Sequence, residues 1–259
     1  MTTKRKRWIV GTTLLCAVAV AAAATVLLLR LREDRQAEPL VIPEGWRAKQ
    51  VYAAADKALS VPGGTTKRAA ERAAKKGALR LPAEAKGNPE GYLFPATYPV
   101  RAKTTPTSLV TSMARTAHDR LSRGGPTSYE TLTIASIVQA EADTPEDMAK
   151  VARVIDNRLK RGMPLQMDSS INYALGRSTL TTTHADTRLD SPYNTYRHKG
   201  LPPTPINNPG PHALKATASP AKGPWLYFVT VKPGDTRFTD DYGQHMKWVK
   251  EFNENQKRD

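Results

Sequence analysis

Two consecutive segments in the middle of the chain carry apolar residues at helical spacing. In the first, over residues 131–141, positions i, i+3, i+4 and i+7 are Ile134, Ile137, Val138 and Glu141. Thr127 and Glu130 in front of it have the spacing of a capping box. The second segment starts with Thr144 and Pro145 and ends at Gly162, and its inward residues are Met148, Val151, Ala152, Ile155 and Leu159. The pattern predicts two helices that meet at a tight corner beside Glu141.

The rest of the chain alternates between helical and extended patterns and contains no internal repeat. In the N-terminal half the patterns predict a strand over 40–45, helices over 46–59 and from Thr65 or Thr66 to about Lys76, an extended aromatic segment over 91–98 and a helix over 108–121. After the two central helices they predict an extended stretch over 164–168 with a short helix to Leu175. A helix over 212–219, a buried strand over 225–231 and a helix over 242–252 complete the expected elements. The fold class that follows is α+β.

Residues 176–211 form a long polar stretch rich in Thr, Asp, Asn, Pro and Gly. Loops of this length are uncommon in compact domains unless they bind something. The prolines restrict the backbone, which suits a preorganised groove wall better than a flexible linker.

The N-terminus predicts the location of the protein. The basic run Lys4-Arg5-Lys6-Arg7 precedes an uncharged, mostly apolar segment over residues 8–29, which is long enough to cross a bilayer core of about 30 Å as a helix. Under the positive-inside rule, the denser basic cluster stays in the cytoplasm. We therefore expect a cytoplasmic tail over residues 1–7, a single transmembrane helix over 8–29 in the plasma membrane, a linker over 30–39 and an extracytoplasmic remainder.

Two other interpretations of the N-terminus fit less well. A cleaved signal peptide would suit the small residues of 19–24, but the apolar run is too long for it. Cys16 follows Leu15, where lipid attachment in bacteria requires Gly or Ala, so a lipoprotein is not expected. Cys16 is the only cysteine, which leaves the exported part without disulfides.

The formal net charge of +15 would indicate nucleic acid for a cytoplasmic protein. For an exported chain, the basic clusters are more simply a solvated helix face, or a weak attraction to anionic lipid and wall polymers. No aromatic residues alternate with them as a stacking platform requires, so no nucleic-acid partner is expected. The five histidines and scattered acids show no metal-ligand spacing, so no metal or cofactor is expected.

Glu141 puts a carboxylate on the apolar stripe of its predicted helix. Partial burial and the negative end of the helix dipole would both raise its pKa. Such a group is suited to be a general acid that holds its proton near neutral pH. Periodicity alone leaves a second interpretation open, in which Glu141 lies at the edge of the core and holds an arginine.

Several short motifs occur in a fixed order between about Leu40 and Phe252. They are Pro89-Glu90-Gly91-Tyr92-Leu93-Phe94-Pro95, Ala135-Ser136-Ile137-Val138-Gln139-Ala140-Glu141, Asn157-Arg158-Leu159, Leu165-Gln166-Met167-Asp168, Tyr193-Asn194-Thr195-Tyr196, Gly200-Leu201-Pro202-Pro203, Asn208-Pro209-Gly210 and Tyr227-Phe228-Val229. In this order they resemble the endolytic murein transglycosylase family, also called YceG-like. Many ordered motifs are far more specific than any single one.

The resemblance implies a small LysM-like module over residues 40–88 and a YceG-like catalytic domain over 89–259. It implies that Glu141 is the catalytic glutamate, which cuts nascent peptidoglycan strands internally between MurNAc and GlcNAc and leaves 1,6-anhydro-muramoyl ends. Termination of glycan elongation would follow. The implied partners are the glycan strands and membrane-bound peptidoglycan synthases.

One carboxylate suffices for this chemistry. An ordinary glycosidase needs a second carboxylate to activate water or to attack carbon, whereas here the C6 hydroxyl of the sugar attacks. The same glutamate can protonate the leaving oxygen and then take the proton of that hydroxyl.

Polar residues of the other motifs are candidates for substrate binding. Gln166 and Asp168 alternate with apolar residues, so in an extended segment both point to one face. Asp168 could instead cap a helix that begins at Ser169. Tyr193, Asn194 and Tyr196 offer stacking faces and amide contacts, although tyrosines that pack a loop give the same pattern.

Asn208 and Glu90 complete the set of candidates. Asn208 could contact sugar or serve as a turn residue before Pro209. Glu90 could bind substrate, orient Glu141 or pair with an arginine, and the structural role is favoured.

The sequence departs from the family pattern at two positions. Gln139 stands where many relatives carry an acid, so a mechanism with two carboxylates two residues apart is excluded. Thr236 stands where relatives often carry a histidine, whereas His245 matches a family position, and a lone helical histidine is more often structural than catalytic.

Two rival functions stay open from the sequence. A hydrolase of the same polymer would use Asp168 or Asp190 to direct water. A non-catalytic scaffold would use the small module and the basic surface to tether the synthesis machinery to the wall.

Overall fold

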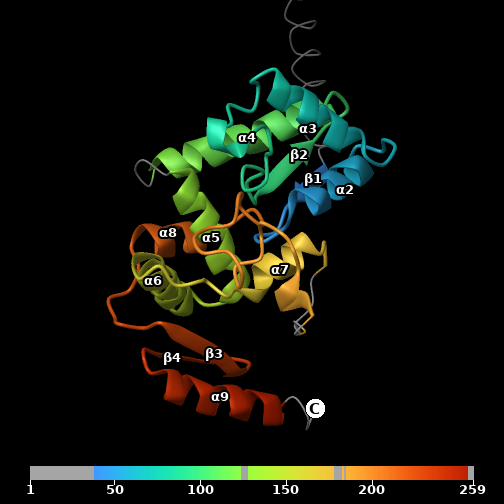
Figure 1. Cartoon of the computed structure of the whole chain (residues 1–259). Coiled ribbons are helices and arrows are strands. Elements are labelled where there is room, and N and C mark those ends of the chain that lie inside the picture. Colours follow the sequence, from blue (N-terminus) through green and yellow to red (C-terminus); the bar gives the residue numbers. More distant parts are fainter. Residues whose placement is uncertain (1–37, 124–127, 178–182, 184, 256–259) are drawn as a thin grey trace, which may run out of the picture.

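The computed structural model describes residues 38–123, 128–177, 183 and 185–255 of the chain, which form three tiers (Figure 1). The predicted tail, transmembrane segment and most of the linker lie outside the described residues. Within the described ranges, no helix combines the length and the apolar character needed to cross a bilayer. Helices and two small antiparallel sheets make up these tiers, in agreement with the predicted α+β class.

The first tier is built around a two-stranded sheet. Strand β1 (Glu38–Val41) pairs with β2 (Thr97–Val100), with Leu40 opposite Tyr98. Between these strands run α2 (Ala48–Ala58), α3 (Thr65–Lys75) and the short 3-10 helix η1 (Ala83–Ala85), and α4 (Pro106–Arg123) follows them and packs on α3. The boundary predicted at residue 89 therefore falls between two strands of one sheet.

Helix α3 begins at Thr65 and its N-cap is Gly64, so the cap predicted at Thr65 or Thr66 is wrong by one residue. The buried carboxylate of Asp56 accepts hydrogen bonds from the Gly64 N–H at 2.6 Å and the Thr66 N–H at 2.7 Å. A side chain from the preceding helix thus satisfies the free N–H groups at this helix start.

The second tier contains the two helices predicted from apolar periodicity. In α5 (Tyr129–Glu141) the Ser128 side chain accepts from the Thr131 N–H, and in α6 (Pro145–Lys160) Thr144 accepts from the Asp147 N–H. The Thr144 cap and the first-turn proline are confirmed. Helices α7 (Asp168–Ala174) and α8 (Pro211–Ala218) complete the tier, and α8 packs against both α5 and α6.

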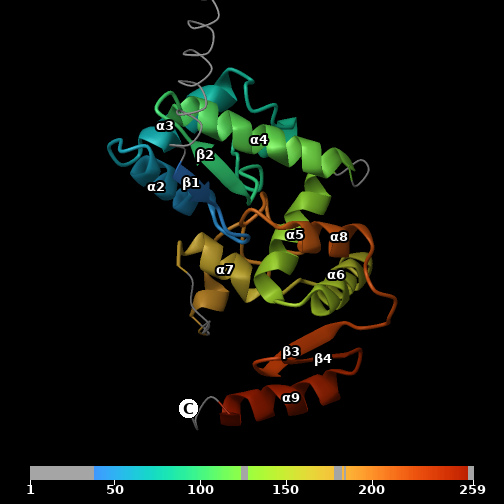
Figure 2. The ribbon, with the colours of Figure 1, turned by 180° about the vertical axis from the view of Figure 1, so that it is seen from behind.

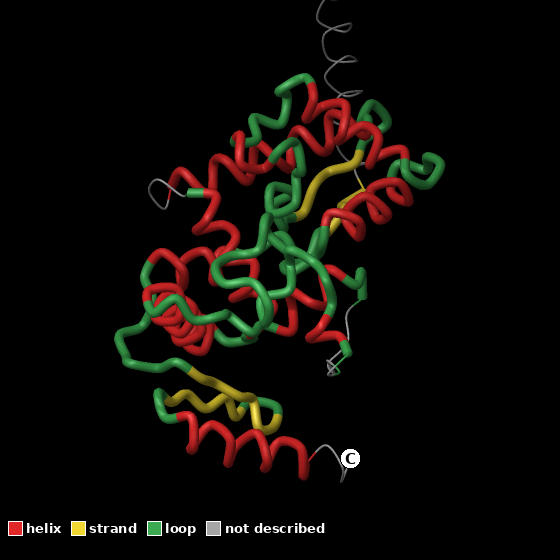
Figure 3. Tube along the Cα trace, viewed as in Figure 1, coloured by secondary structure: helices red, strands yellow, loops and turns green. Residues whose placement is uncertain are grey.

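Loops cross between the first and second tiers, as the green segments of Figure 3 show. The described part of the long polar stretch contains one short 3-10 helix, η2 (Asp186–Arg188). Pro205 in this stretch packs against the motif glycine Gly91, whose φ is +85° and where an added Cβ would lie 2.8 Å from the proline ring. Glycine is required there because both the positive φ and the close approach exclude a larger residue.

The third tier is a hairpin with a helix beneath it, seen from behind in Figure 2. It consists of β3 (Tyr227–Lys232), β4 (Asp235–Thr239) and α9 (Tyr242–Asn255). The strand was predicted to be buried, but within it only Val231 is, because a two-stranded sheet leaves most positions half-exposed.

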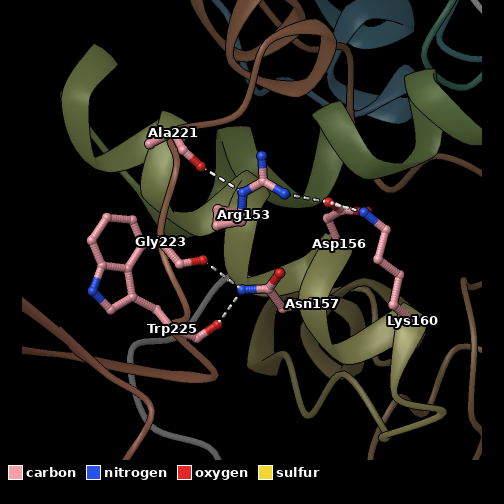
Figure 4. Close-up of polar contacts among 7 residues, drawn as sticks. All are labelled: Arg153, Asp156, Asn157, Lys160, Ala221, Gly223 and Trp225. Atoms are coloured by element: carbon pink, nitrogen blue, oxygen red, sulfur yellow. Dashed lines mark hydrogen bonds and ion pairs between the residues drawn. The ribbon is translucent and has the colours of Figure 1, made fainter.

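Side chains of α6 hold the segment that leads into this hairpin (Figure 4). The Arg153 Nε donates to the Ala221 carbonyl at 2.5 Å, and the Asn157 amide donates to the carbonyls of Gly223 at 3.1 Å and Trp225 at 2.8 Å. These bonds fix where the third tier begins relative to α6.

Candidate active site

A cleft of about 1060 Å³ is lined by residues of all three tiers. The first tier contributes Gly45, Arg47 and Gln50, the second contributes Glu141 and the residues around Asp168, and the third contributes β3 and one stripe of α9. This volume lies at the upper end of the ~300–1,000 Å³ typical of small-molecule sites, so the cleft can hold more than a single small ligand.

Glu141 is the last residue of α5 and lies on this cleft. Ile137 and Val138 of its stripe are fully buried, while Glu141 itself is half-buried. Its carboxyl accepts one long hydrogen bond, 3.4 Å from the Ser169 N–H in the first turn of α7. The predicted alternative, an ion pair with an arginine, is not formed by Glu141 within the described part of the chain.

Burial raises the pKa of Glu141 above its ordinary value. The nearby Ser169 side chain and N–H oppose this shift, and the negative charge of Asp168 adds to it. The Ser169 hydroxyl lies close to Glu141, yet it makes no hydrogen bond of good geometry among the described residues. The protonated form of this carboxyl is therefore favoured more than in an exposed glutamate, and the side chain lines the cleft.

Asp168 and Tyr196 form a pair beside Glu141. The Tyr196 hydroxyl donates to Asp168 Oδ1 at 2.5 Å, and both residues line the cleft. Burial first, and then Asp168, raises the pKa of Tyr196, so this hydroxyl remains a donor. Asp168 is the first residue of α7 and Met167 is the N-cap, so the alternative in which Asp168 caps a helix from Ser169 is not observed.

Gln166 also lines the cleft, although not in the predicted conformation. Its φ is +52°, so the segment is not a regular strand and alternation does not explain the direction of its side chain. The Gln166 N–H donates to the Thr195 carbonyl at 3.0 Å. Leu165 and Met167 are buried on either side, which leaves Gln166 exposed to the cleft.

Arg158 lines the cleft and belongs to one of the ordered motifs, but no role was predicted for it. Its side chain is 6 % exposed, and it donates to the carbonyls of Leu226 at 2.6 Å and Leu165 at 2.7 Å. Arg158 therefore ties the start of the hairpin to the segment in front of α7. A signal was available, since Arg158 completes the apolar stripe of Val151 and Ile155 at i+7, as Glu141 does on α5.

Glu90 lies away from the cleft lining. It is 4 % exposed and accepts from the Ala48 N–H at 2.8 Å and the Tyr173 hydroxyl at 3.1 Å. Burial raises the pKa of Glu90 to about 7, although these bonds and the charge of Arg47 oppose the shift. Glu90 joins the first turn of α2 to α7, which is the structural role favoured from the sequence, and it makes no hydrogen bond to Glu141 among the described contacts.

Three further candidates pack loops rather than lining the cleft. Asn194 is fully buried and its amide donates to the carbonyls of Thr187 and Leu189. Asn208 is fully buried too; its side-chain oxygen accepts from the Leu93 N–H, and its amide donates to the Trp46 carbonyl. The Tyr193 hydroxyl lies 2.9 Å from Thr204 Oγ1, and its ring packs against Tyr173. Of the predicted contacts, the cleft lining includes Gln166, Asp168 and Tyr196.

Gln139, which departs from the family pattern, and His245, which matches it, both have defined contacts. Gln139 accepts from the Gly210 N–H at 2.8 Å, which stabilises the start of α8. His245 lies on the cleft and stacks on Tyr227, with ring centroids 5.2 Å apart. No cluster of His, Cys, Asp and Glu suited to a metal ion occurs among the described residues.

A half-buried acid on a cleft, with a second carboxylate and a tyrosine beside it, is typical of enzymes that cleave polysaccharides. The family model named YceG-like family matches residues 18–251, so the chain belongs to the YceG-like family. The resemblance inferred from the ordered motifs is confirmed.

Relatives of known name agree with this assignment. The chain is 37 % identical over 166 residues to a Bacillus subtilis (strain 168) protein named endolytic murein transglycosylase, covering 61 % of this chain and 46 % of that protein. It is 38 % identical over 175 residues to a protein of the same name from Streptococcus pneumoniae serotype 2 (strain D39 / NCTC 7466), covering 62 % and 32 %. The chain thus spans less than half the length of these relatives.

A solved structure has the same fold. A YceG-like protein from Listeria monocytogenes matches with a TM-score of 0.71 at 30 % identity, over 81 % of this chain and 75 % of that one.

Proposed function

We propose that this protein is an endolytic murein transglycosylase in which Glu141 is the general acid and base. The observation that carries the proposal is a carboxyl of raised pKa, with one long hydrogen bond, at the edge of a cleft of about 1060 Å³. The names of the Bacillus and Streptococcus relatives support the same substrate, the glycan strand of peptidoglycan.

The proposed reaction needs no water. Glu141 donates its proton to the oxygen that links MurNAc to GlcNAc, and the bond from C1 of MurNAc to that oxygen breaks. The C6 hydroxyl of the same MurNAc then forms the new bond to C1, and the Glu141 carboxylate takes the proton of that hydroxyl. A 1,6-anhydro-muramoyl end and a free GlcNAc hydroxyl result, and the enzyme returns to its starting state.

Hydrolysis by two carboxylates is the rival chemistry. Asp190 gives it little support because its side chain is 93 % exposed, pairs with Arg197 at 3.6 Å and is not part of the cleft lining. Asp168 does line the cleft, where its Oδ1 accepts from the Tyr196 hydroxyl at 2.5 Å. We assign Asp168 to binding substrate and to raising the pKa of Glu141, and the masses of the products test this assignment against activation of water.

Under the rival hypothesis of a non-catalytic scaffold, the function of the protein would not depend on Glu141. Incubation of the full chain in detergent with uncross-linked glycan strands should yield fragments with anhydro ends by mass spectrometry. The Glu141→Gln protein should yield at least about a hundredfold fewer of these fragments, while it unfolds at the same temperature. Cleavage at the rate of the unchanged protein would contradict the proposal, and absence of cleavage by the unchanged protein would favour the scaffold.

We also propose the membrane topology predicted from the sequence, with residues 8–29 as a single transmembrane helix and the described tiers outside the cytoplasm. The basic run before this segment supports it. A LysM-like role for the first tier is supported by Gly45, Arg47 and Gln50, which bring this tier to the cleft. Membrane-bound peptidoglycan synthases are the partners that fit this location. Protease access from each side of sealed membrane vesicles tests the topology.

A further inference from the structure

Helix α9 presents two faces to different surroundings. One face packs on the hairpin, where Glu251 binds Arg237 at 2.8 Å, Trp248 lies 5.9 Å from the same guanidinium, and the Asn255 amide donates to the Val231 carbonyl. The other face lines the cleft with Tyr242, His245, Met246, Val249, Phe252 and Asn253. These positions follow helical spacing, so they form one continuous stripe along the cleft.

The cleft-facing stripe leaves apolar surface open to solvent. Tyr242 is 60 % exposed and Met246 is 44 % exposed, and they are two of the four large apolar side chains that are exposed in the described part of the chain. Single exposed apolar residues are ordinary, whereas two neighbours within a cleft indicate a surface that binds something.

Three rings form an aromatic wall, which we define as Tyr227, Tyr242 and His245. The ring of His245 stacks on Tyr227 at 5.2 Å with an interplanar angle of 23°, and Tyr242 lies 5.5 Å from Tyr227. The guanidinium of Arg158, which also lines the cleft, lies 5.3 Å from the Tyr227 ring. Tyr227 and His245 are therefore held by their neighbours, and Tyr242 is the exposed ring of the wall.

His245 contributes to the wall as a neutral ring. Burial and then the positive charge of Arg158 lower the pKa of His245, and its buried Nδ1 has no partner among the described residues. A buried imidazole without a partner costs less in its neutral form than an imidazolium would, and the guanidinium of Arg158 would repel the charged form.

We propose that the aromatic wall and Met246 form a stacking subsite for an amino-sugar ring of the glycan strand, next to the pair of sugars that Glu141 separates. The inference rests on the proposed function and adds a second binding position to it. The faces of a pyranose ring carry C–H groups that stack on aromatic rings, while its edges keep their hydrogen bonds. Asn253, Gln166 and Thr230 line the same cleft and can meet those edges.

The cleft geometry favours a strand as the occupant. The wall and Glu141 line one continuous cleft, so a ligand held at Glu141 that extends along it reaches α9. A volume of about 1060 Å³ exceeds the need of a single sugar, and an enzyme that cuts within a strand must hold sugars on both sides of the cut.

Strand affinity in the Glu141→Gln protein tests the subsite without turnover. Titration of uncross-linked glycan strands into this full-length protein should give a dissociation constant that rises about tenfold when Tyr242→Ala is added, because a stacked ring contributes on that order. Tyr242→Phe keeps the ring and should bind within about twofold of the parent, since only the hydroxyl is lost. Met246→Ala should weaken binding less than Tyr242→Ala does.

Lys247→Ala is the matched control, because Lys247 is exposed on the same helix and is not part of the cleft lining. It should leave the dissociation constant unchanged. Equal affinity of the Tyr242→Ala protein and its parent would overturn the subsite but leave the proposed function standing. Failure of the Glu141→Gln protein to bind strands, together with no cleavage by the unchanged protein, would overturn both.

Discussion

Glu141 and Glu90 are both carboxylic acids whose pKa is raised chiefly by burial, yet their surroundings differ. Glu141 lies on the cleft and accepts one hydrogen bond at 3.4 Å. Glu90 is 4 % exposed, and three donors from other segments contact it, namely the Ala48 N–H at 2.8 Å, the Tyr173 hydroxyl at 3.1 Å and the Asn208 amide at 3.4 Å. A raised pKa therefore does not by itself mark a reactive acid. The number of internal partners and access to the cleft separate the two.

The largest effect that separates the two acids should come from Glu141→Gln. Glutamine cannot give or take the proton, so kcat should fall by about 10²–10⁴-fold. Because only one long hydrogen bond reaches the carboxyl, and glutamine can still accept it, thermal unfolding should stay close to that of the unchanged protein. A normal rate from this protein would mean that Glu141 is as structural as Glu90.

Glu90→Ala should show the opposite balance, with a large effect on stability. It leaves a buried N–H and a hydroxyl without the Glu90 acceptor and leaves the Asn208 amide with only the Trp46 carbonyl, which should lower the free energy of unfolding by about 2–4 kcal/mol. Chemical denaturation measures this loss. As a control, Glu90→Gln keeps an acceptor and should retain most of the activity, since Glu90 does not line the cleft. Loss of cleavage by well-folded Glu90→Gln protein would contradict the distinction.

The pH dependence of stability should also identify Glu90. Its folded pKa is about 7 against an ordinary value of 4.5, so the folded state binds the proton more tightly than the unfolded state. This contribution is fully present below about pH 4.5 and is lost as pH rises through about 7, and it amounts to about 3 kcal/mol. Between these pH values, the free energy of unfolding should fall less steeply with rising pH for Glu90→Gln than for the unchanged protein. Equal slopes would show that Glu90 does not titrate in this range.

Asp168→Asn should have a smaller effect, which concerns the pH dependence of cleavage by Glu141. The negative charge of Asp168 raises the pKa of Glu141, and asparagine can still accept from the Tyr196 hydroxyl. The pH at which cleavage declines on the alkaline side should therefore move down. A pH–rate profile that keeps its alkaline limb in place would mean that Asp168 does not influence the proton on Glu141.

The smallest effect is expected from Asp190→Asn. Asp190 is solvent-exposed and lies off the cleft lining, so neither the rate of strand cleavage nor the masses of the products should change. This protein is the matched control for Asp168→Asn. A product whose mass differs from that of the unchanged protein would reopen hydrolysis directed by Asp190.

Features set by neighbouring residues could be predicted from the sequence. The Thr144 cap, the following proline and the apolar stripes gave α5 and α6 and put Glu141 at their corner. Helix starts and apolar periodicity depend on residues a few positions apart, which a sequence displays directly. Arg158 was missed even though the same periodicity placed it on the inward stripe of α6.

Contacts between distant segments could not be predicted. Asn194 and Asn208 were candidates for contacting sugar, with a turn role as the alternative for Asn208. Their side chains bond to backbone groups of loops, in the case of Asn208 to the Trp46 carbonyl far along the chain. The pairing of β1 with β2 likewise joins segments on either side of two helices. Which polar side chains hydrogen-bond to the backbone of a loop depends on the conformation of that loop, and tertiary packing determines this conformation.

In the proposed reaction the C6 hydroxyl of the sugar, and not water, forms the new bond to C1 beside Glu141. Cleavage of glycan strands by the full chain in water enriched with ¹⁸O measures this directly. We predict anhydro-ended products that contain no ¹⁸O. Products that carry ¹⁸O at a new reducing end would contradict the account and identify the protein as a hydrolase.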